Sequence, residues 1–269
     1  MKKFFTVLMA IIMGFACLTM AACQETDNGK ETLYVYTNAG FAPYEYLTVD
    51  GKVVGVDIEI MEEIAEVLDY NLVVKDIKFE QILEEVQRNK FAVGAAGMTK
   101  NDERDAIALS SISYATSVQY VIAPAGTFSG TVSLEQLAGK KIGTQNGTTG
   151  YYMVSDAIDG TTDDDGNHVT GELENTNASV IKYQNAILAS NDIGSRVDCV
   201  VIDKLPAESI AQSNSALECY PIDAEPESYV IYFNKQATDL VEKVNQVLQV
   251  LIDEGVVNYL TLKHSGGII

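Results

Sequence analysis

One short stretch of the chain, Ala96–Arg104, combines groups that suit the recognition of a small anion. It reads AGMTKNDER and places Thr99 and Arg104 five residues apart, directly after a turn of small residues. A guanidinium can hold a carboxylate through two parallel hydrogen bonds, and a nearby hydroxyl can add another donor. The alternative is a surface ion pair between Arg104 and Asp102 or Asp105, which is the usual situation of an arginine.

Composition excludes several classes of function. The chain has 269 residues, 47% of them hydrophobic, and a formal net charge of −20 at pH 7. This length is enough for one large or two medium domains with a full core. A strongly acidic surface repels a phosphate backbone, so we expect no nucleic-acid partner. No C-x-x-C or similar metal spacing occurs in the sequence, and we expect no metal and no cofactor.

Residues 1–22 have the pattern of a secretory signal peptide. Two lysines precede a hydrophobic run that ends in Ala21-Ala22-Cys23. This ending resembles a bacterial lipobox, which predicts lipidation of Cys23 and a tether over residues 23–31. The alternative is an uncleaved helix over residues 4–22, which is just long enough to span a membrane. We expect an exported domain that is lipid-anchored on the extracytoplasmic side of the bacterial cell envelope.

Two cysteines, Cys199 and Cys219, remain beyond the N-terminal segment. Export would permit a disulfide between them. Each lies in a hydrophobic run typical of a strand, where a buried free thiol is at least as good an interpretation.

The hydrophobic periodicity predicts two α/β units in series. In a predicted helix over 57–69, one face carries Ile60, Met61, Ile64, Val67 and Leu68. The β-α-β order predicts a parallel sheet covered by helices. The first unit has strands over 33–36, 71–74 and 91–97, with helices over 57–69 and 80–89. The second unit has strands over 140–145, 179–183, 197–203 and 217–222, with helices over 149–158, 185–192 and 205–213.

Two extended hydrophobic stretches, 117–126 and 227–235, separate and follow these units. We interpret them as two crossings between two lobes, the second leading into a helix over 238–252. The predicted fold is therefore α/β with two lobes, each a mostly parallel sheet flanked by helices, joined by two hinge strands. The predicted lobes are residues 32–118 with 228–269, and residues 119–227.

A polar segment, residues 159–177, interrupts the second unit. Its Asp165-Gly166 pair is a turn signal, so an exposed hairpin is the simpler interpretation. The segment can also be aligned with a calcium-binding loop, but Thr161 stands where that loop requires a carboxylate.

The order of these motifs resembles family 3 of the bacterial solute-binding proteins, the amino-acid receptors of ABC importers. The resemblance covers about residues 32–264. It rests on the runs TNAGFAPYEY, GKVVGVDIEIMEEIAEVL, AGMTKNDERDAIALSSISY, SLEQLAGKKIGTQNGTTGYY, RVDCVVIDKLPA, ESYVIYFNK and VNQVLQVLIDEGVVNYL. It implies a monomer that closes two lobes around a free L-amino acid and delivers it to a permease.

The resemblance assigns each part of an amino acid to particular residues. Arg104 and Thr99 bind the carboxylate, the Gly97 carbonyl accepts from the ammonium, and Asp203 binds the ammonium from the second lobe. The N–H groups and hydroxyls at a helix start add to the anion site, and two aromatic rings enclose the ligand side chain. The implied ligand-binding residues are Asn38, Phe41, Phe79, Ala96, Gly97, Thr99, Arg104, Thr148, Thr149 and Asp203.

Each of these residues also has a purely structural interpretation. Asp203 can cap the helix that follows it, the threonines can belong to turns or caps, and the phenylalanines can be core residues. Their joint occurrence in this order favours the binding site.

The sequence leans toward a neutral, polar or modestly apolar ligand. Family members for basic amino acids usually carry Asp at the position of Asn38, and often Ser at that of Ala96. Glu45 leaves a basic ligand open.

Two rival functions stay open at this point. One is an exported enzyme on the same fold, similar to a prephenate or arogenate dehydratase. Against it, no Ser-His-Asp set is visible, and the only histidines are His168 and His264. The other is an orphan amino-acid sensor that signals through a partner.

Overall fold

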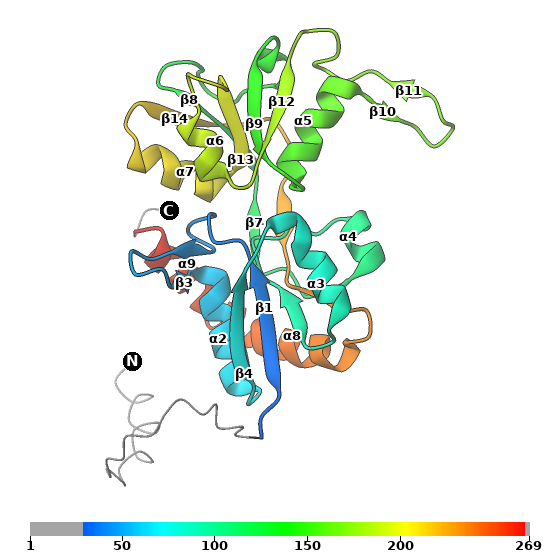
Figure 1. Cartoon of the computed structure of the whole chain (residues 1–269), viewed down its shortest axis with the longest axis vertical. Helices are drawn as coiled ribbons and strands as arrows, with labels where there is room; N and C mark the ends of the chain where they lie inside the picture. Colours follow the sequence, from blue (N-terminus) through cyan, green and yellow to red (C-terminus); the bar gives the residue numbers. More distant parts are fainter. Residues whose placement is uncertain (1–28, 267–269) are drawn as a thin grey trace. The chain divides into compact units, whose positions relative to one another are not determined.

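Two five-stranded sheets organise the part of the chain that this computed structural model describes, residues 29–266 (Figure 1). The predicted signal peptide and Cys23 lie outside the described residues. By its internal contacts the chain divides into two compact units, Met1–Lys30 and Glu31–Ile269, and the second is described below. No helix between residues 29 and 266 is long and apolar enough to cross a membrane.

The first sheet carries the predicted β-α-β order. Its strands, in spatial order, are β4 (Asn71–Asp76), β1 (Thr32–Thr37), β5 (Ala92–Gly94), β16 (Tyr232–Phe233) and β6 (Leu109–Ser110). β1 pairs in parallel with β4 and β5, and β16 inserts antiparallel between β5 and β6. Side chains alternate along β1, so Leu33 and Val35 enter one core cluster and Tyr36 packs against another.

Helices cover both faces of this sheet. They are α2 (Val56–Val67), α3 (Ile82–Arg88) after the 3-10 turn η1 (Phe79–Gln81), the short α4 (Asp102–Ile107), α8 (Thr238–Asp253) and α9 (Val256–His264), beside a small hairpin of β2 (Tyr46–Leu47) and β3 (Val53–Val54). Helices α2, α8 and α9 contact one another. Ile60, Met61 and Ile64 of α2 are buried as predicted, but Val67 is 63% exposed. The prediction is wrong for Val67 alone, because the next residue, Leu68, packs against the core and Val67 faces solvent.

The second sheet repeats this arrangement. Its strands, in spatial order, are β12 (Ser179–Tyr183), β9 (Lys141–Gln145), β13 (Cys199–Asp203), β8 (Gln119–Pro124) and β14 (Leu217–Pro221). Its helices are α5 (Thr149–Asp159), α6 (Ala186–Asn191) and α7 (Lys204–Ser213), with the 3-10 turn η2 (Leu134–Leu137) after β8. In each sheet two pairings are parallel and two antiparallel. The antiparallel pairings arise because the strand that follows each crossing, β8 or β16, inserts between two strands that run in the opposite direction.

Two crossings join the sheets and pair with each other. β7 (Ala115–Ser117) leads from β6 to β8, and β15 (Glu227–Tyr229) leads from β14 back to β16. They run antiparallel, with Glu227 opposite Ser117. The expected two-lobed α/β fold with two hinge strands is confirmed (Figure 1). Below, lobe 1 denotes residues 32–118 with 228–269, and lobe 2 denotes residues 119–227.

The polar insert forms a hairpin. β10 (Thr161–Thr162) pairs antiparallel with β11 (His168–Val169), and Figure 1 shows it extending away from the second sheet. The Asp163 carboxylate accepts hydrogen bonds from the N–H groups of Asp165 and Asn167, so it closes its own turn. Among residues 29–266, no group of acidic, histidine or cysteine side chains is arranged to hold a metal ion.

The two cysteines lie on different strands of the second sheet. Val200, beside Cys199, and Cys219 both pair with Ile122, from opposite sides of β8. The cysteine backbones are therefore about two strand spacings apart, roughly 10 Å, whereas a disulfide needs about 4.4–6.8 Å between Cα atoms. Both are free thiols, Cys199 buried and Cys219 half-buried.

Candidate functional site

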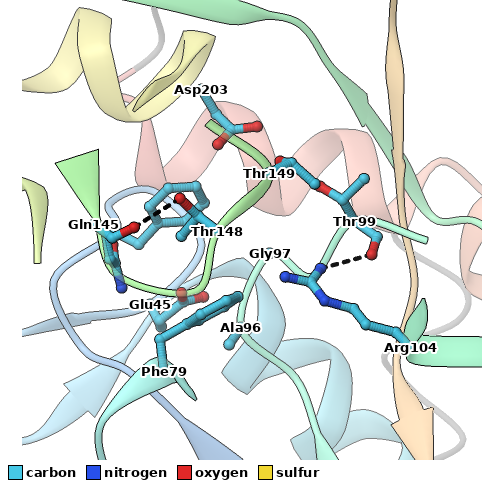
Figure 2. Close-up of a pocket in the computed structure, with 11 residues that line it drawn as sticks. Glu45, Phe79, Ala96, Gly97, Thr99, Arg104, Gln145, Thr148, Thr149 and Asp203 are labelled. Carbon is cyan, nitrogen blue, oxygen red and sulfur yellow. Dashed lines mark hydrogen bonds between the residues drawn. The ribbon is translucent and has the colours of Figure 1, made fainter. Parts of the chain in front are cut away.

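A pocket lies where loops of lobe 1 face loops of lobe 2, with an empty volume of about 300 Å³, part of it open to solvent. Its lining includes every predicted ligand-binding residue except Asn38, and adds Glu45 and Gln145. The lining residues are Phe41, Glu45, Phe79, Ala96, Gly97, Thr99, Arg104, Gln145, Thr148, Thr149 and Asp203 (Figure 2). Their loops follow the ends of β1, β5, β9 and β13, so the sheets bring distant parts of the sequence together.

Arg104 points into this pocket and not to the surface. It lies in α4, whose start is capped by the Asn101 side chain accepting from the Arg104 N–H (2.9 Å). Its guanidinium donates to the carbonyls of Thr99 (2.7 Å) and Gly147 (3.2 Å) and lies 5.3 Å from the Phe79 ring centroid. Burial lowers the pKa of Arg104 from its usual value, and nearby anionic groups oppose this change.

The surface ion-pair interpretation of Arg104 is wrong. Asp105 is bound by Lys100 instead, and Arg104 is 7% exposed. These two carbonyls leave other guanidinium N–H groups for a ligand, because the group has five donors. Figure 2 shows the guanidinium directed toward Gly97 and the centre of the pocket.

Gly97 brings the backbone close to the pocket. Its φ of +53° belongs to the left-handed region that favours glycine. A Cβ at this position would lie 2.5 Å from Cε1 of Phe41. Its N–H donates to Asp57 Oδ2 at 2.8 Å, so the start of α2 holds the binding loop in place.

The start of α5 faces the same space. Thr148 is its N-cap: the side-chain oxygen accepts from the Tyr151 N–H (3.2 Å), and the hydroxyl donates to the Gln145 carbonyl (2.9 Å). Thr149 begins the helix, and its hydroxyl donates to Glu227 (2.8 Å). The N–H groups of a first helical turn have no acceptor within the helix and favour an anion.

The Thr99 hydroxyl also donates to Glu227, at the same oxygen, Oε2. A hydroxyl has one proton, so neither threonine hydroxyl donates into the pocket in this arrangement. Their expected role as donors to a ligand carboxylate stays a prediction. The donors that remain for an anion are Arg104 and the first turn of α5.

Asp203 provides a carboxylate from lobe 2. It stands at the N-cap position of α7, but its side chain makes no capping bond, so the capping interpretation is wrong. Instead Oδ1 accepts from the Tyr229 hydroxyl (2.7 Å). Burial, and then the nearby Glu227, raise the pKa of Asp203 to about 7, against the hydrogen bonds from Tyr229, Ser117 and Gln119.

Glu45 is a second carboxylate in the pocket. The sequence analysis named it only as a residue that leaves a basic ligand open, and not among the ligand-binding residues. It is 1% exposed, and within the described residues its Oε2 has no hydrogen-bond partner. Burial raises the pKa of Glu45 well above its usual value, and the charges of Asp57, Asp76 and Asp203 add to this. The sequence signal for its burial in the pocket was the position of an acid within the aromatic run FAPYEY.

Asn38 lies behind the pocket. Its Nδ2 donates to the Ile77 carbonyl (2.6 Å), and its Oδ1 accepts from Gln145 Nε2 (3.0 Å). Asn38 therefore orients Gln145, which does line the pocket, and this bond joins lobe 1 to lobe 2. Sequence reasoning missed Gln145, although it lies within the quoted run GTQNGTTG.

The titratable side chains in the lining are one cation, Arg104, and two acids, Glu45 and Asp203. Neither histidine lines this pocket: His168 lies in the exposed hairpin, and His264 contacts Glu59 at 2.9 Å and Tyr46 at 3.0 Å. The arrangement suits a small molecule that carries both charges, held by groups of both lobes.

The comparisons with known proteins agree with this geometry. The family model for bacterial extracellular solute-binding proteins, family 3, matches residues 33–267. The arginine-binding extracellular protein ArtP of Bacillus subtilis is 25% identical over 269 residues, which is 98% of this chain and 98% of that protein.

Solved structures of similar proteins share the fold. The amino acid ABC transporter substrate-binding protein AbpA of Streptococcus pneumoniae, bound to L-arginine, is 26% identical with a TM-score of 0.77, over 89% of this chain and 96% of its own. An ancestral arginine-binding protein bound to glutamine is 28% identical with a TM-score of 0.75, over 89% of this chain and 99% of its own. Because the family model spans nearly all of the described chain, this chain belongs to family 3 of the bacterial extracellular solute-binding proteins.

Proposed function

We propose that this protein is the extracytoplasmic receptor of an ABC importer and that its ligand is an L-amino acid with a cationic side chain, arginine first. The observation that carries the choice of ligand is Glu45, a buried carboxylate in the pocket whose Oε2 lacks a hydrogen-bond partner among the described residues. The relatives named above that bind arginine support the same choice.

The charges in the pocket support a ligand with two cationic groups. Arg104 would bind the ligand carboxylate, and Asp203 would bind the α-ammonium. Glu45 then needs a partner of its own, because an ionised carboxylate is costly to bury unpaired. A planar guanidinium between Phe41 and Phe79 could donate to Glu45 and contact the ring faces.

This proposal replaces the lean toward a neutral ligand. That lean rested on Asn38 and Ala96, which lack the features common in receptors for basic amino acids. In the structure Asn38 lies behind Gln145, outside the pocket lining. Glu45 supplies the negative charge from another position.

Glutamine is the second candidate. Its amide oxygen could accept a hydrogen bond from a neutral Glu45, and the raised pKa of Glu45 favours the neutral acid. The glutamine-bound ancestral protein gives this alternative its support.

Binding would close the two lobes. The ligand's carboxylate and side chain would contact lobe 1 through Arg104 and Glu45, while its ammonium would contact lobe 2 through Asp203. Closure excludes water from the pocket and strengthens these charged contacts. A permease would recognise the closed form, and a lipid on Cys23 would keep the receptor at the membrane. We propose no catalytic role.

The test is calorimetry on the purified protein after it has been unfolded and refolded to remove carried ligand. We expect binding of arginine, and we expect Arg104→Ala to abolish it. Glu45→Gln should weaken the affinity for arginine more than tenfold and change the affinity for glutamine less than threefold, because only the cationic side chain needs the charge of Glu45. Equal effects on both ligands would contradict the cationic assignment. If no amino acid binds the wild-type protein, the proposed function fails.

A further inference from the structure

We infer that Glu227, in the hinge strand β15, is a positioning residue that couples lobe closure to the binding pocket. When the lobes are closed, its carboxylate accepts a hydrogen bond from one threonine hydroxyl of each lobe. The inference rests on the proposed function for its biological meaning, although its central test needs no ligand.

Three donors from three separate segments converge on this one carboxylate. Oε2 accepts from the hydroxyls of Thr99, after β5 in lobe 1, and Thr149, at the start of α5 in lobe 2. Oε1 accepts from Gln119 Nε2 (3.0 Å) at the start of β8. Glu227 itself is half-buried and lies outside the pocket lining.

The backbone around Glu227 explains why it can reach both lobes. β15 runs beside the binding loop of lobe 1, because the Lys100 N–H donates to the Ser228 carbonyl (2.8 Å) and the Val230 N–H to the Met98 carbonyl (3.0 Å). On its other side β15 pairs with β7, the first crossing. Glu227 therefore lies in the hinge strand β15, with hydrogen bonds to both loops that carry Thr99 and Thr149.

Opening the lobes must break this arrangement. Thr99 belongs to lobe 1 and Thr149 to lobe 2, so their hydroxyls can share one oxygen only in the closed arrangement. Glu227 would thus favour the closed state, and a binding-competent state that is more populated raises the apparent affinity.

The same contacts connect closure to the ligand. Thr99 and Thr149 both line the pocket, and the Thr99 carbonyl accepts from the Arg104 guanidinium. Because Glu227 accepts hydrogen bonds from both hydroxyls, it sets the orientation of both threonine side chains toward the ligand. A purely structural role, as an ordinary hydrogen-bonded acid in a hinge, would affect folding without affecting closure.

The experiment compares Glu227→Ala with the wild type by small-angle X-ray scattering of the purified, ligand-stripped protein. We expect a larger radius of gyration for Glu227→Ala, because the open population rises. On saturation with arginine the two radii should converge. Stopped-flow measurements should show about a tenfold weaker affinity, expressed mainly as faster dissociation.

Two further variants separate hydrogen bonding from charge and from general effects. Glu227→Gln keeps an oxygen acceptor for the two hydroxyls, so it should restore most of the closed population. Glu225→Ala removes an exposed acid two residues earlier and should match the wild type. If Glu227→Ala does not fold, Thr149→Val removes the lobe 2 donor alone and should produce the same opening.

A lower melting temperature with an unchanged radius would overturn the inference and leave Glu227 a structural residue. Opening of Glu227→Gln to the same extent as Glu227→Ala would also overturn it, because charge and not hydroxyl binding would then matter. The ligand-free comparison stands even if arginine does not bind. A failure of arginine to bind would count against the proposed function alone.

Discussion

The carboxylate of Asp57 accepts a hydrogen bond from the backbone N–H of Gly97 at 2.8 Å. The same carboxylate accepts from the Tyr114 hydroxyl at 2.7 Å. The first turn of α2, the binding loop after β5 and the segment before the first crossing therefore meet at one buried acid. This contact fixes the loop that carries Gly97 and Thr99, and with it the wall of the pocket in lobe 1.

We expect Asp57→Ala to lower the free energy of unfolding by about 3 kcal/mol, because two hydrogen bonds to a charged acceptor are lost and the Tyr114 hydroxyl stays buried. Burial raises the pKa of Asp57 to about 6, so the carboxylate is ionised at pH 8. Urea unfolding at pH 8 measures the loss. Asp57→Asn keeps one acceptor oxygen and should lose less than Asp57→Ala. Equal losses for both variants would show that the Gly97 and Tyr114 contacts do not depend on that acceptor.

Gly97→Ala should abolish high-affinity binding and cost about 1–2 kcal/mol of stability. The new Cβ would meet Phe41 at 2.5 Å, and the backbone would hold a positive φ without glycine. The control is Gly51→Ala, where φ is +80° and no atom lies within 4 Å of the added Cβ. We expect Gly51→Ala, which has the positive φ without the clash, to cost less stability than Gly97→Ala and to leave the affinity unchanged. A normal affinity in Gly97→Ala would contradict the close approach that we assign to this loop.

Much of the fold follows from local patterns in the sequence. The alternation along β1 and the buried stripe of α2 predict their elements, because burial on one face imposes a period of two or of about four residues. The two-lobed arrangement also follows, since the hydrophobic stretches 117–126 and 227–235, which contain β8 and β16, interrupt the β-α rhythm twice.

The site was less predictable where contacts join distant residues. The helix that carries Arg104 has six residues, too few for a periodic pattern. Glu45 and Glu227 differ from surface acids only through what surrounds them. Glu227 accepts hydrogen bonds from Thr99, which is 128 positions away in the sequence, and from Thr149, which is 78 positions away. No short-range pattern contains such a contact, so the sequence does not predict that the hydroxyls of Thr99 and Thr149 donate to Glu227.

Cys199 and Cys219 should both react as free thiols, because β8 lies between their strands. We expect iodoacetamide to modify both cysteines in denaturant without reductant. In the folded protein Cys219 should react first, since Cys199 is fully buried, and burial raises the pKa of its thiol to about 12. Peptide mass spectrometry measures both results. A peptide that contains Cys199 linked to Cys219 would contradict the sheet order.

Ligand affinity should depend on pH through Asp203. Burial and Glu227 raise the pKa of this group to about 7, against 3.8 for an unperturbed aspartate. Binding of an ammonium requires the ionised form, so the ligand must displace a proton below pH 7. We expect the dissociation constant to rise about tenfold between pH 8 and pH 6.

The stability of the unbound protein should change in the opposite direction. A raised pKa in the folded state gives a contribution that is complete below pH 3.8 and is lost as the pH rises through about 7. Glu45, whose pKa the charge of Asp203 helps to raise, and Asp57 also titrate with raised pKa values, so the comparison with Asp203→Asn isolates this one group. In Asp203→Asn the affinity should be weak at every pH and the slope between pH 6 and pH 8 much smaller. Calorimetry in buffers of different ionisation enthalpy counts the released protons directly. If the pH dependence of the affinity is unchanged in Asp203→Asn, the displaced proton comes from Glu45, which is the other acid in the pocket lining.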